Sequence, residues 1–370
     1  MSADTPVVGP ATEVIGRPAT VEVVDADVHP LPRSASELRD YLPEPWQGVP
    51  EQLISSYHLV LYLPPAQPLR RDAIGPNGEV PGSSPELTYA QLIEEAGVDL
   101  AILLPLVRNH ANPDYESALC RATNDWLAAT WLSEYNAHGR YFGSINVCAS
   151  DPQGAVAEIE RCAPNDRFVQ IRLNAYAGLP YGDPFYDPIY DAAVRHRLPV
   201  AVHFSKGAGI SLLTPVGFSS YFFEHHALYP ITYAAHVTSL ICGGTFDRFP
   251  ELTYVFVEGG FSWILPLLWR LEHNWDELHD EVPARRRPIE YLREHMRFTS
   301  QPIEEPERSA FLRVLEWADA GSLLLFSSDY PHWDFDDPHQ IRQRIPNNLR
   351  RRVFRDNAID VYGLPTEVRV

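Results

Sequence analysis

Short apolar segments alternate with segments in which apolar residues recur at helical spacing along most of the chain. This alternation is typical of a parallel sheet whose strands are joined by helices. The pattern predicts seven clear strands and a weaker eighth strand at Met296–Thr299. The clear strands are Val21–Val28, Leu100–Leu104, Tyr141–Val147, Phe168–Leu173, Leu198–His203, Thr253–Glu258 and Leu323–Ser328. Asp151-Pro152 and Asp187-Pro188 each place a capping acid before a proline, which predicts a helix start at both positions.

Eight strands with intervening helices favour an α/β fold, a (β/α)₈ TIM barrel, over the whole chain. A doubly wound sheet is the alternative, but its Gly-x-Gly-x-x-Gly fingerprint is missing after the first strand. We expect one barrel domain over residues 21–364. A flexible N-terminal segment (1–20) and a short C-terminal tail (365–370) would flank it.

Two long segments interrupt the alternation. The first covers about residues 45–90 and includes the proline-rich Pro64–Pro85, which predicts a lid-like insertion. The second, Gly207–Ser239, is rich in aromatic residues and histidines and is also interpreted as a loop. Both leave the carboxyl ends of strands, where barrel enzymes build their sites. The prediction is therefore a distorted barrel with long loop insertions over its C-terminal face.

Composition narrows the class of partner. The 370 residues carry a formal charge of −19, which argues against nucleic acid or an anionic membrane surface. No apolar run approaches the roughly 20 residues of a membrane span. Four cysteines without a Cys-x-x-Cys pair, behind an N-terminus that lacks a signal-peptide pattern, predict reduced thiols and a cytoplasmic protein.

Ionisable residues gather at the end of the first predicted strand. Because side chains alternate, Asp25, Asp27 and His29 share one face of this strand. Charges on a buried strand need partners. Asp27 and His29 could reach one cation, or they could form an Asp–His hydrogen bond at an exposed strand end.

Two further strands end on residues of the same kind. His203 closes the strand at Leu198–His203, and Asp329 follows the strand at Leu323–Ser328. Alone, each has an ordinary alternative, a structural histidine or a helix-capping aspartate. Together with Asp27 and His29, they give two carboxylates and two imidazoles at carboxyl strand ends. Such a set suits a divalent ion such as zinc or manganese.

At this point the chain resembles the amidohydrolase-related (amidohydrolase 2) group of the metal-dependent amidohydrolase superfamily. The best-known members of this group are similar to aminocarboxymuconate-semialdehyde decarboxylase. The matching pieces are DADVHP at Asp25–Pro30, LPVAVH at Leu198–His203, GGTFDRFPELTYVFVEGGFSW at Gly243–Trp263, FSSDYPHWD at Phe326–Asp334 and DNAIDVYGL at Asp356–Leu364. The resemblance implies one divalent metal ion, expected to be Zn²⁺ with Mn²⁺ as the alternative, in a protein that forms homodimers. The ligands it implies are Asp27, His29, His203 and Asp329.

The sequence departs from the family pattern at Glu258, where the decarboxylases usually carry a catalytic histidine. A glutamate can also act as acid or base when burial raises its pKa. It could instead be a structural carboxylate paired with an arginine. His225 or His226 could supply the missing imidazole, unless both are simply solvated, and His226 is taken as the catalytic candidate. Binuclear branches of the superfamily that this chain resembles use a lysine carbamate on the fourth strand. The only lysine here, Lys206, lies outside that strand, so the resemblance does not imply a carbamate-bridged metal pair.

Other residues are expected to contact the substrate or to support the ligands. Arg172 is a candidate anchor for a carboxylate, with a structural ion pair as the equal alternative. Tyr221 and Trp263 are candidates to contact a planar ring. Asp25 and His332 are placed beside the ligands as supporting residues.

The resemblance favours non-oxidative decarboxylation of a small aromatic or enoic carboxylic acid, with Asp329 and metal-bound water as acid and base. The alternative is hydrolysis of a lactone, an amide or a related carbonyl compound at the same site. A catalytically inactive barrel with a binding role is a second alternative. In each enzymatic case the partner is a small molecule.

Overall fold

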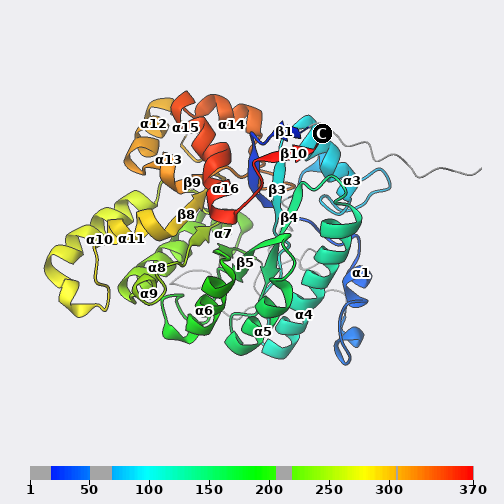
Figure 1. Cartoon of the computed structure of the whole chain (residues 1–370), viewed down its shortest axis with the longest axis horizontal. Coiled ribbons are helices and arrows are strands. Elements are labelled where there is room, and N and C mark those ends of the chain that lie inside the picture. The colour runs from blue at the N-terminus through cyan, green and yellow to red at the C-terminus, as the bar shows by residue number, and fades with distance from the viewer. Residues whose placement is uncertain (1–17, 51–68, 206–218, 306, 370) are drawn as a thin grey trace, which may run out of the picture.

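The computed structural model describes residues 18–50, 69–205, 219–305 and 307–369. Within these ranges, eight parallel strands follow one another in chain order around a single sheet, β2 to β9 (Figure 1). The strands are β2 (Val24–Val28), β3 (Leu100–Leu103), β4 (Tyr141–Asn146), β5 (Phe168–Asn174), β6 (Val200–His203), β7 (Tyr254–Phe256), β8 (Met296–Thr299) and β9 (Leu324–Leu325). The predicted order of eight strands is confirmed.

The barrel closes through the segment that follows the very short strand β9. The amide of Ala26 donates to the carbonyl of Phe326 (3.0 Å), and the amide of His29 donates to the carbonyl of Tyr330 (2.8 Å). In the opposite direction, the amide of Asp329 donates to the carbonyl of Asp27 (3.1 Å). The seam between the first and last strands is therefore the place where three of the predicted ligands meet.

Helices surround the strands (Figure 1). The α-helices are α1 (Ala35–Arg39), α3 (Pro85–Thr88), α4 (Pro113–Trp126), α5 (Pro152–Cys162), α6 (Asp187–His196), α7 (Phe222–Ala227), α8 (Tyr229–Cys242), α9 (Thr245–Arg248), α10 (Ile264–Leu278), α11 (Pro288–His295), α12 (Arg308–Trp317), α13 (Ala320–Leu323), α14 (Pro338–Arg344), α15 (Asn347–Arg351) and α16 (Asn357–Tyr362). The π-helical segments are Tyr89–Glu95, Leu127–Glu134 and Arg352–Asp356, and the 3₁₀ turns are Trp46–Gly48, Arg71–Ala73, Pro184–Tyr186 and His279–Glu281.

The predicted helix starts lie close to the observed ones. Asp151 caps α5, and its side chain accepts a hydrogen bond from the amide of Gly154 (3.0 Å). Helix α6 begins one residue earlier than predicted, with Asp187 already inside the first turn and Tyr186 at the cap. Proline stands in the first turn of both helices, where its missing N–H costs no helical hydrogen bond.

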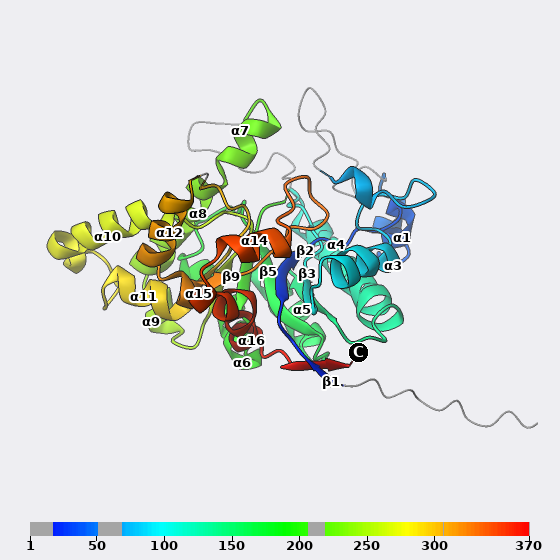
Figure 2. The ribbon, with the colours of Figure 1, turned by 90° about the horizontal axis from the view of Figure 1, so that it is seen from above.

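The two ends of the described chain pair with each other. Strands β1 (Pro18–Thr20) and β10 (Glu367–Arg369) form a separate antiparallel ribbon. Residues 1–17, most of the expected N-terminal segment, lie outside the described residues. Figure 2 shows this ribbon on the opposite side of the molecule from α7. The ribbon therefore lies away from the carboxyl ends of the strands, where the predicted site is.

The interpretation of Gly207–Ser239 as a loop is wrong for its second half, which forms α7 and most of α8. Helix α8 buries its apolar face at helical spacing, and the buried residues are Tyr229, Tyr233, His236, Val237, Leu240 and Ile241. This helical spacing is present in the sequence and is the signal for α8. Residues 206–218 lie outside the described part.

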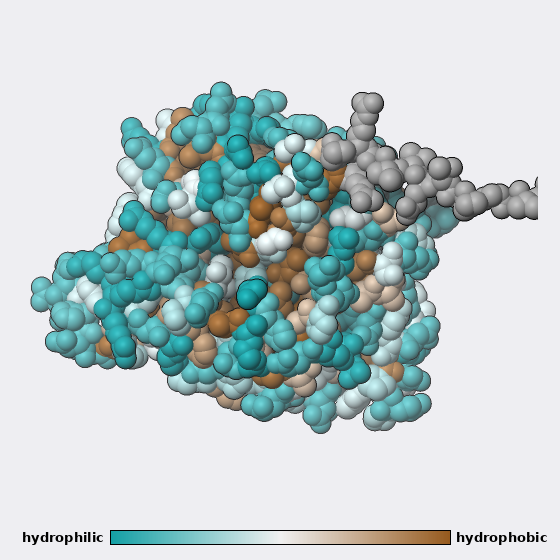
Figure 3. Space-filling model, viewed as in Figure 1, coloured by the Kyte–Doolittle hydropathy of each residue, from teal (hydrophilic) through white to brown (hydrophobic). Residues whose placement is uncertain are grey.

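The expected lid at about residues 45–90 is described only in part, because residues 51–68 lie outside the described ranges. Its second half contacts the closing seam, since Leu69 pairs with His332 and the amide of Arg70 donates to the carbonyl of Pro331 (2.8 Å). In the face shown in Figure 3, hydrophilic residues dominate the periphery. Within the described ranges, no helix combines the length and the apolar character that crossing a bilayer requires.

Candidate metal centre

All four predicted ligands lie at the carboxyl ends of barrel strands. Asp27 belongs to β2 and His29 follows it directly, while His203 is the last residue of β6. Asp329 lies beyond β9, in the segment that closes the barrel. Each of these side chains is fully buried. Parallel strands bring their carboxyl ends to one end of a barrel, and this arrangement explains why residues 300 positions apart meet.

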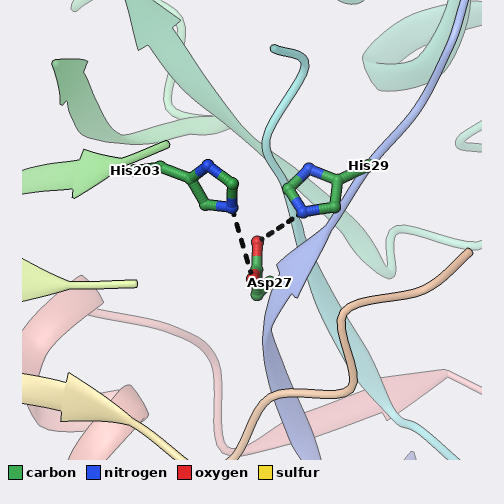
Figure 4. A group of neighbouring side chains, drawn as sticks. All are labelled: Asp27, His29 and His203. Atoms are coloured by element: carbon green, nitrogen blue, oxygen red, sulfur yellow. Dashed lines mark ion pairs between the residues drawn. The ribbon is translucent and has the colours of Figure 1, made fainter. Parts of the chain in front are cut away.

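Figure 4 shows the imidazoles of His29 and His203 directed at the carboxylate of Asp27. The Nε2 atom of His29 lies 3.1 Å from Oδ1 of Asp27 and 3.0 Å from Oδ1 of Asp329. The Nε2 atom of His203 lies 3.6 Å from Oδ2 of Asp27. Two groups of possible ligands result, Asp27 with His29 and His203, and His29 with Asp329 and His332. His29 belongs to both groups.

Backbone carbonyl groups fix the orientation of both imidazoles. The Nδ1 atom of His29 lies 2.8 Å from the carbonyl oxygen of Leu104, and Nδ1 of His203 contacts the carbonyl oxygen of Phe204. A carbonyl can only accept, so each Nδ1 carries the hydrogen. The Nε2 atoms are thereby aimed at Asp27, as in histidines that bind a metal through Nε2.

The atoms that face one another lack hydrogen-bond partners among the described residues. Both carboxylate oxygens of Asp27, Nε2 of His29 and Nε2 of His203 are buried in this state. Buried polar atoms without partners are costly, and native proteins rarely contain several together. A divalent cation would satisfy all of them at once. Carboxylate and imidazole ligands in this combination fit zinc or manganese.

The electrostatics of the cluster favour a bound positive charge. Burial opposes ionisation, but the imidazoles of His29 and His203 hold the pKa of Asp27 well below its usual value. Against the effect of burial, Asp27 and Asp329 raise the pKa of His29 well above its usual value. Burial lowers the pKa of His203. Without a metal, the site therefore holds an anionic Asp27 and a protonated His29.

Glu258 enters the site from the turn after β7. Its Oε2 atom lies 3.1 Å from Nε2 of His203, so the described structure pairs it with an imidazole and not with an arginine. Burial, together with the charges of Asp329 and Asp27, raises the pKa of Glu258 well above its usual value. A carboxyl group with this pKa can keep a proton near neutral pH and donate it.

Asp25 contacts the segment after β9 that closes the barrel, and His332 belongs to that segment. The carboxylate of Asp25 accepts hydrogen bonds from the backbone amide (2.9 Å) and the hydroxyl (2.5 Å) of Ser328, and from the amide of Asp27 (3.2 Å). Burial raises the pKa of Asp25 to about 7. The Nδ1 atom of His332 lies 2.5 Å from Oδ1 of Asp329. Asp25 therefore ties together the two segments that carry the predicted ligands, and His332 orients Asp329.

The three predicted substrate contacts lie in different surroundings. The terminal nitrogens of buried Arg172 donate to the carbonyl oxygens of Val107 (2.7 Å) and His203 (3.3 Å). The indole of Trp263 donates to the carbonyl oxygen of Gly260 (3.1 Å), beside Glu258 in the chain. Tyr221 caps α7 and is more than half exposed. Arg172 thus holds the backbone of a predicted ligand.

His226 contacts a residue that sequence reasoning missed. Its Nε2 atom lies 3.2 Å from Oδ2 of Asp334, whereas the neighbouring His225 contacts the hydroxyl of Tyr176. Gln301, also missed, donates through Nε2 to Oδ2 of Asp334 (3.0 Å) and to Oδ2 of Asp329 (3.2 Å). Both missed residues follow predicted strands, and this position is the signal that could have identified them.

Comparison with known proteins places the chain in context. The family model described as amidohydrolase matches residues 24–364, which is nearly the whole described barrel. The matched range begins at the first residue of β2 and ends two residues after α16. It contains every predicted site residue.

A curated relative is the gamma-resorcylate decarboxylase of Polaromonas sp. (strain JS666 / ATCC BAA-500), 25% identical over 271 residues, which are 66% of this chain and 77% of the relative. An amidohydrolase structure from Mycobacterium avium subsp. paratuberculosis K-10 matches with a TM-score of 0.73 and 19% identity, covering 93% of this chain and 98% of that one. A third match is the structure of a dihydroxybenzoic acid decarboxylase from Polaromonas sp. JS666 with bound manganese and the inhibitor 2-nitroresorcinol. Its TM-score is 0.65 at 17% identity, and the match covers 93% of this chain and 97% of that one. At these identities the two solved structures establish the fold.

Proposed function

The chain belongs to the amidohydrolase family, and on this basis we propose that it catalyses the metal-dependent, non-oxidative decarboxylation of a small aromatic or enoic carboxylic acid. The observation that carries the proposal is the buried cluster of unsatisfied ligand atoms on Asp27, His29 and His203, with Asp329 beside it. The choice of decarboxylation is supported by a relative that is a gamma-resorcylate decarboxylase.

Asp27, His29, His203 and Asp329 would hold one divalent ion. The ion would supply Lewis-acid charge that orients the substrate through its anionic groups. The ligand set contains as many carboxylates as imidazoles, which suits both Zn²⁺ and Mn²⁺. We propose Zn²⁺ as the resident ion, with Mn²⁺ as the alternative supported by the manganese-containing decarboxylase structure.

Asp329 is proposed to carry the proton that the reaction consumes. Its Oδ1 atom contacts His29 and His332, and its Oδ2 atom accepts a hydrogen bond from Gln301. A proton passes from Asp329 to the ring carbon that bears the carboxylate. The carbon–carbon bond then breaks, its electron pair restores the ring, and CO₂ leaves. Glu258, protonated because of its burial, is a second donor on the His203 side of the cluster.

Arg172 is proposed to act through the backbone of His203, since both its terminal nitrogens donate to carbonyl groups. Trp263 remains a candidate to contact the substrate ring because it lies at the turn that carries Glu258. Tyr221 is a candidate from the exposed end of α7. The partner is a small-molecule carboxylate.

The hydrolytic alternative is not favoured, because the curated relative and the manganese-containing structure are both decarboxylases. A catalytically inactive barrel is also disfavoured. In an inactive barrel, selection would not maintain buried ligand atoms without hydrogen-bond partners, because such atoms cost free energy of folding.

The test uses the full chain, stripped of metal with a chelator and reloaded with Zn²⁺ or Mn²⁺. A panel of hydroxybenzoates is screened for CO₂ release, alongside lactones and amides screened for hydrolysis. We expect CO₂ from at least one ring acid, dependent on added metal and absent in Asp27→Asn. Hydrolysis of a lactone or amide without CO₂ release, or failure to bind either metal, would overturn the proposal.

We also propose a homodimer in the cytoplasm. Exposed tryptophans support the dimer, since Trp269 and Trp317 contact each other at 6.0 Å between ring centroids while each is 56% exposed. The four free cysteines support a reducing compartment. Sedimentation equilibrium tests the first proposal, and a single species at the monomer mass would overturn it. Localisation of a tagged chain tests the second.

A further inference from the structure

A histidine–aspartate pair lies next to the metal cluster but outside it. His226 belongs to α7, which Figure 2 shows on the side of the barrel opposite the β1–β10 ribbon. Its Nε2 atom lies 3.2 Å from Oδ2 of Asp334, and the imidazole is only 19% exposed. The rings of Phe222, Tyr229 and Trp333 surround it at 5.1–6.0 Å between centroids. The pair is therefore partly desolvated and fixed in position.

Gln301 connects this pair to Asp329. The Nε2 atom of Gln301 donates to Oδ2 of Asp334 at 3.0 Å and to Oδ2 of Asp329 at 3.2 Å. The two carboxylate oxygens share one nitrogen and therefore lie no more than about 6 Å apart. Gln301 is fully buried, so its amide cannot turn toward solvent. A neutral amide donor can hold two carboxylates close together without itself changing charge.

We propose that His226 is a second acid–base group of this site, with Asp334 and Gln301 as its positioning residues. The inference rests on the proposed decarboxylation, in which each turnover consumes one proton: a carboxylate and a proton give CO₂ and a C–H bond. After Asp329 has given its proton to the ring carbon, the protonated His226 returns one through a water molecule. An N–H bond of His226 breaks, an O–H bond forms on Asp329, and the neutral imidazole takes a proton from solvent.

The charges around His226 suit this role. The carboxylates of Asp334, Asp329 and Glu304 face it, and they raise its pKa despite its burial. Asp334 therefore stabilises the charged form that donates the proton. Gln301 keeps Asp334 near Asp329, so the proton is delivered where it is consumed. His225, the preceding residue on α7, contacts the hydroxyl of Tyr176.

The first experiment does not depend on activity. The pKa of His226 is measured by NMR of the imidazole nitrogens in the wild type and in Asp334→Asn, with His226→Gln to assign the signal. We expect the pKa to fall in Asp334→Asn. His279→Gln is the matched control, because His279 also lies near an aspartate, Asp280, but on the exposed surface. An unchanged His226 pKa in Asp334→Asn would overturn the pairing.

The second experiment follows kcat for CO₂ release against pH in the metal-loaded enzyme. We expect His226→Gln to lower kcat about 100-fold and to remove the alkaline fall, with KM changed far less. Asp334→Asn and Gln301→Leu should move the alkaline fall to lower pH or lower kcat, while His279→Gln matches the wild type. A wild-type profile in His226→Gln would overturn the proposal. If no ring acid releases CO₂ while the NMR shift is found, the proposed reaction fails and the pairing stands.

Discussion

Glu258 and Asp329 share a left-handed backbone conformation, each with φ of 61°. Both carry carboxylates that face the same buried cluster, one beside His203 and the other beside His29. A non-glycine residue in this region costs roughly 1–2 kcal/mol, and such residues gather at functional sites. The turns after β7 and after β9 therefore lower the stability of the fold, and in return they direct two carboxyl groups at the same buried cluster.

The first prediction concerns the stability effect of Glu258. Its pKa is raised in the folded state, so folding retains a proton that the unfolded chain loses above pH 4.5. The stability of the wild type therefore falls as pH rises above that value. Glu258→Gln cannot ionise, so we expect it to be more stable than the wild type by about 1 kcal/mol at pH 8, with little difference near pH 4.5.

Denaturant unfolding of the metal-free proteins at both pH values measures this difference. Glu294→Gln is the control, because Glu294 forms an exposed ion pair with Arg286 and its loss should change stability by less than about 0.5 kcal/mol. Decarboxylation by Glu258→Gln should also decrease, since the variant cannot donate a proton. A variant that is less stable than the wild type at pH 8 contradicts the interpretation.

The second prediction concerns metal affinity. Asp27 contacts both imidazoles, and both of its oxygens lack other partners in the described structure. Asp27→Asn removes a ligand charge, so we expect the affinity for Zn²⁺ and Mn²⁺ to fall by more than about 100-fold. Asp280→Asn, at a position whose side chain is 98% exposed, should bind as the wild type does. Competition with a chelating dye measures both affinities, and equal values for the two variants would be incompatible with a ligand role for Asp27.

The third prediction concerns the proton that the protein releases when a metal binds. Asp27 and Asp329 raise the pKa of His29, so the metal-free site holds a protonated imidazole. A metal needs the neutral Nε2, and binding must therefore release a proton. We expect apparent affinity to fall as pH decreases, by up to about tenfold per pH unit below the pKa of His29. Calorimetry in two buffers with different heats of ionisation counts the protons, and a count of zero would exclude this protonation state.

The barrel and the convergence of the four predicted ligands were predictable because both depend on local patterns. The strand ending at His203 and the Asp-x-His of the first strand need only an apolar run followed by ionisable residues. Once eight parallel strands are expected, geometry brings their carboxyl ends together. The order of strands β2 to β9 confirms that step.

The contacts between loops were not predictable in the same way. Gln301 and Asp334 are 33 positions apart, and the position of each residue after a strand does not show that the two side chains meet. The nitrogens of Arg172 donate to the carbonyl groups of Val107 and His203, which follow β3 and end β6. Backbone acceptors leave no trace in the identity of the residues that carry them. Such contacts depend on the tertiary structure of the loops.

The last prediction concerns stability at acid pH and uses a histidine that is not part of the metal cluster. His236 is buried in α8, where Nε2 donates to the carbonyl oxygen of Ala175 (2.8 Å) and Nδ1 accepts from the amide of Tyr181 (3.2 Å). Both nitrogens are satisfied only in the neutral form, and burial lowers the pKa of His236 to about 4. The unfolded chain binds a proton below pH 6.5, whereas the folded chain does not until about pH 4.

Stability should therefore be unaffected by His236 above pH 6.5 and should fall by about 3 kcal/mol as pH decreases from 6.5 to 4. His236→Gln removes this titration, so the slope of unfolding free energy against pH should flatten over that interval, whatever the absolute stability of the variant. His279→Gln, which removes a half-exposed imidazole, should keep the wild-type slope. A slope in His236→Gln that equals the wild-type slope would mean that His236 is already protonated in the folded protein, and the hydrogen bond from Tyr181 would then have to break.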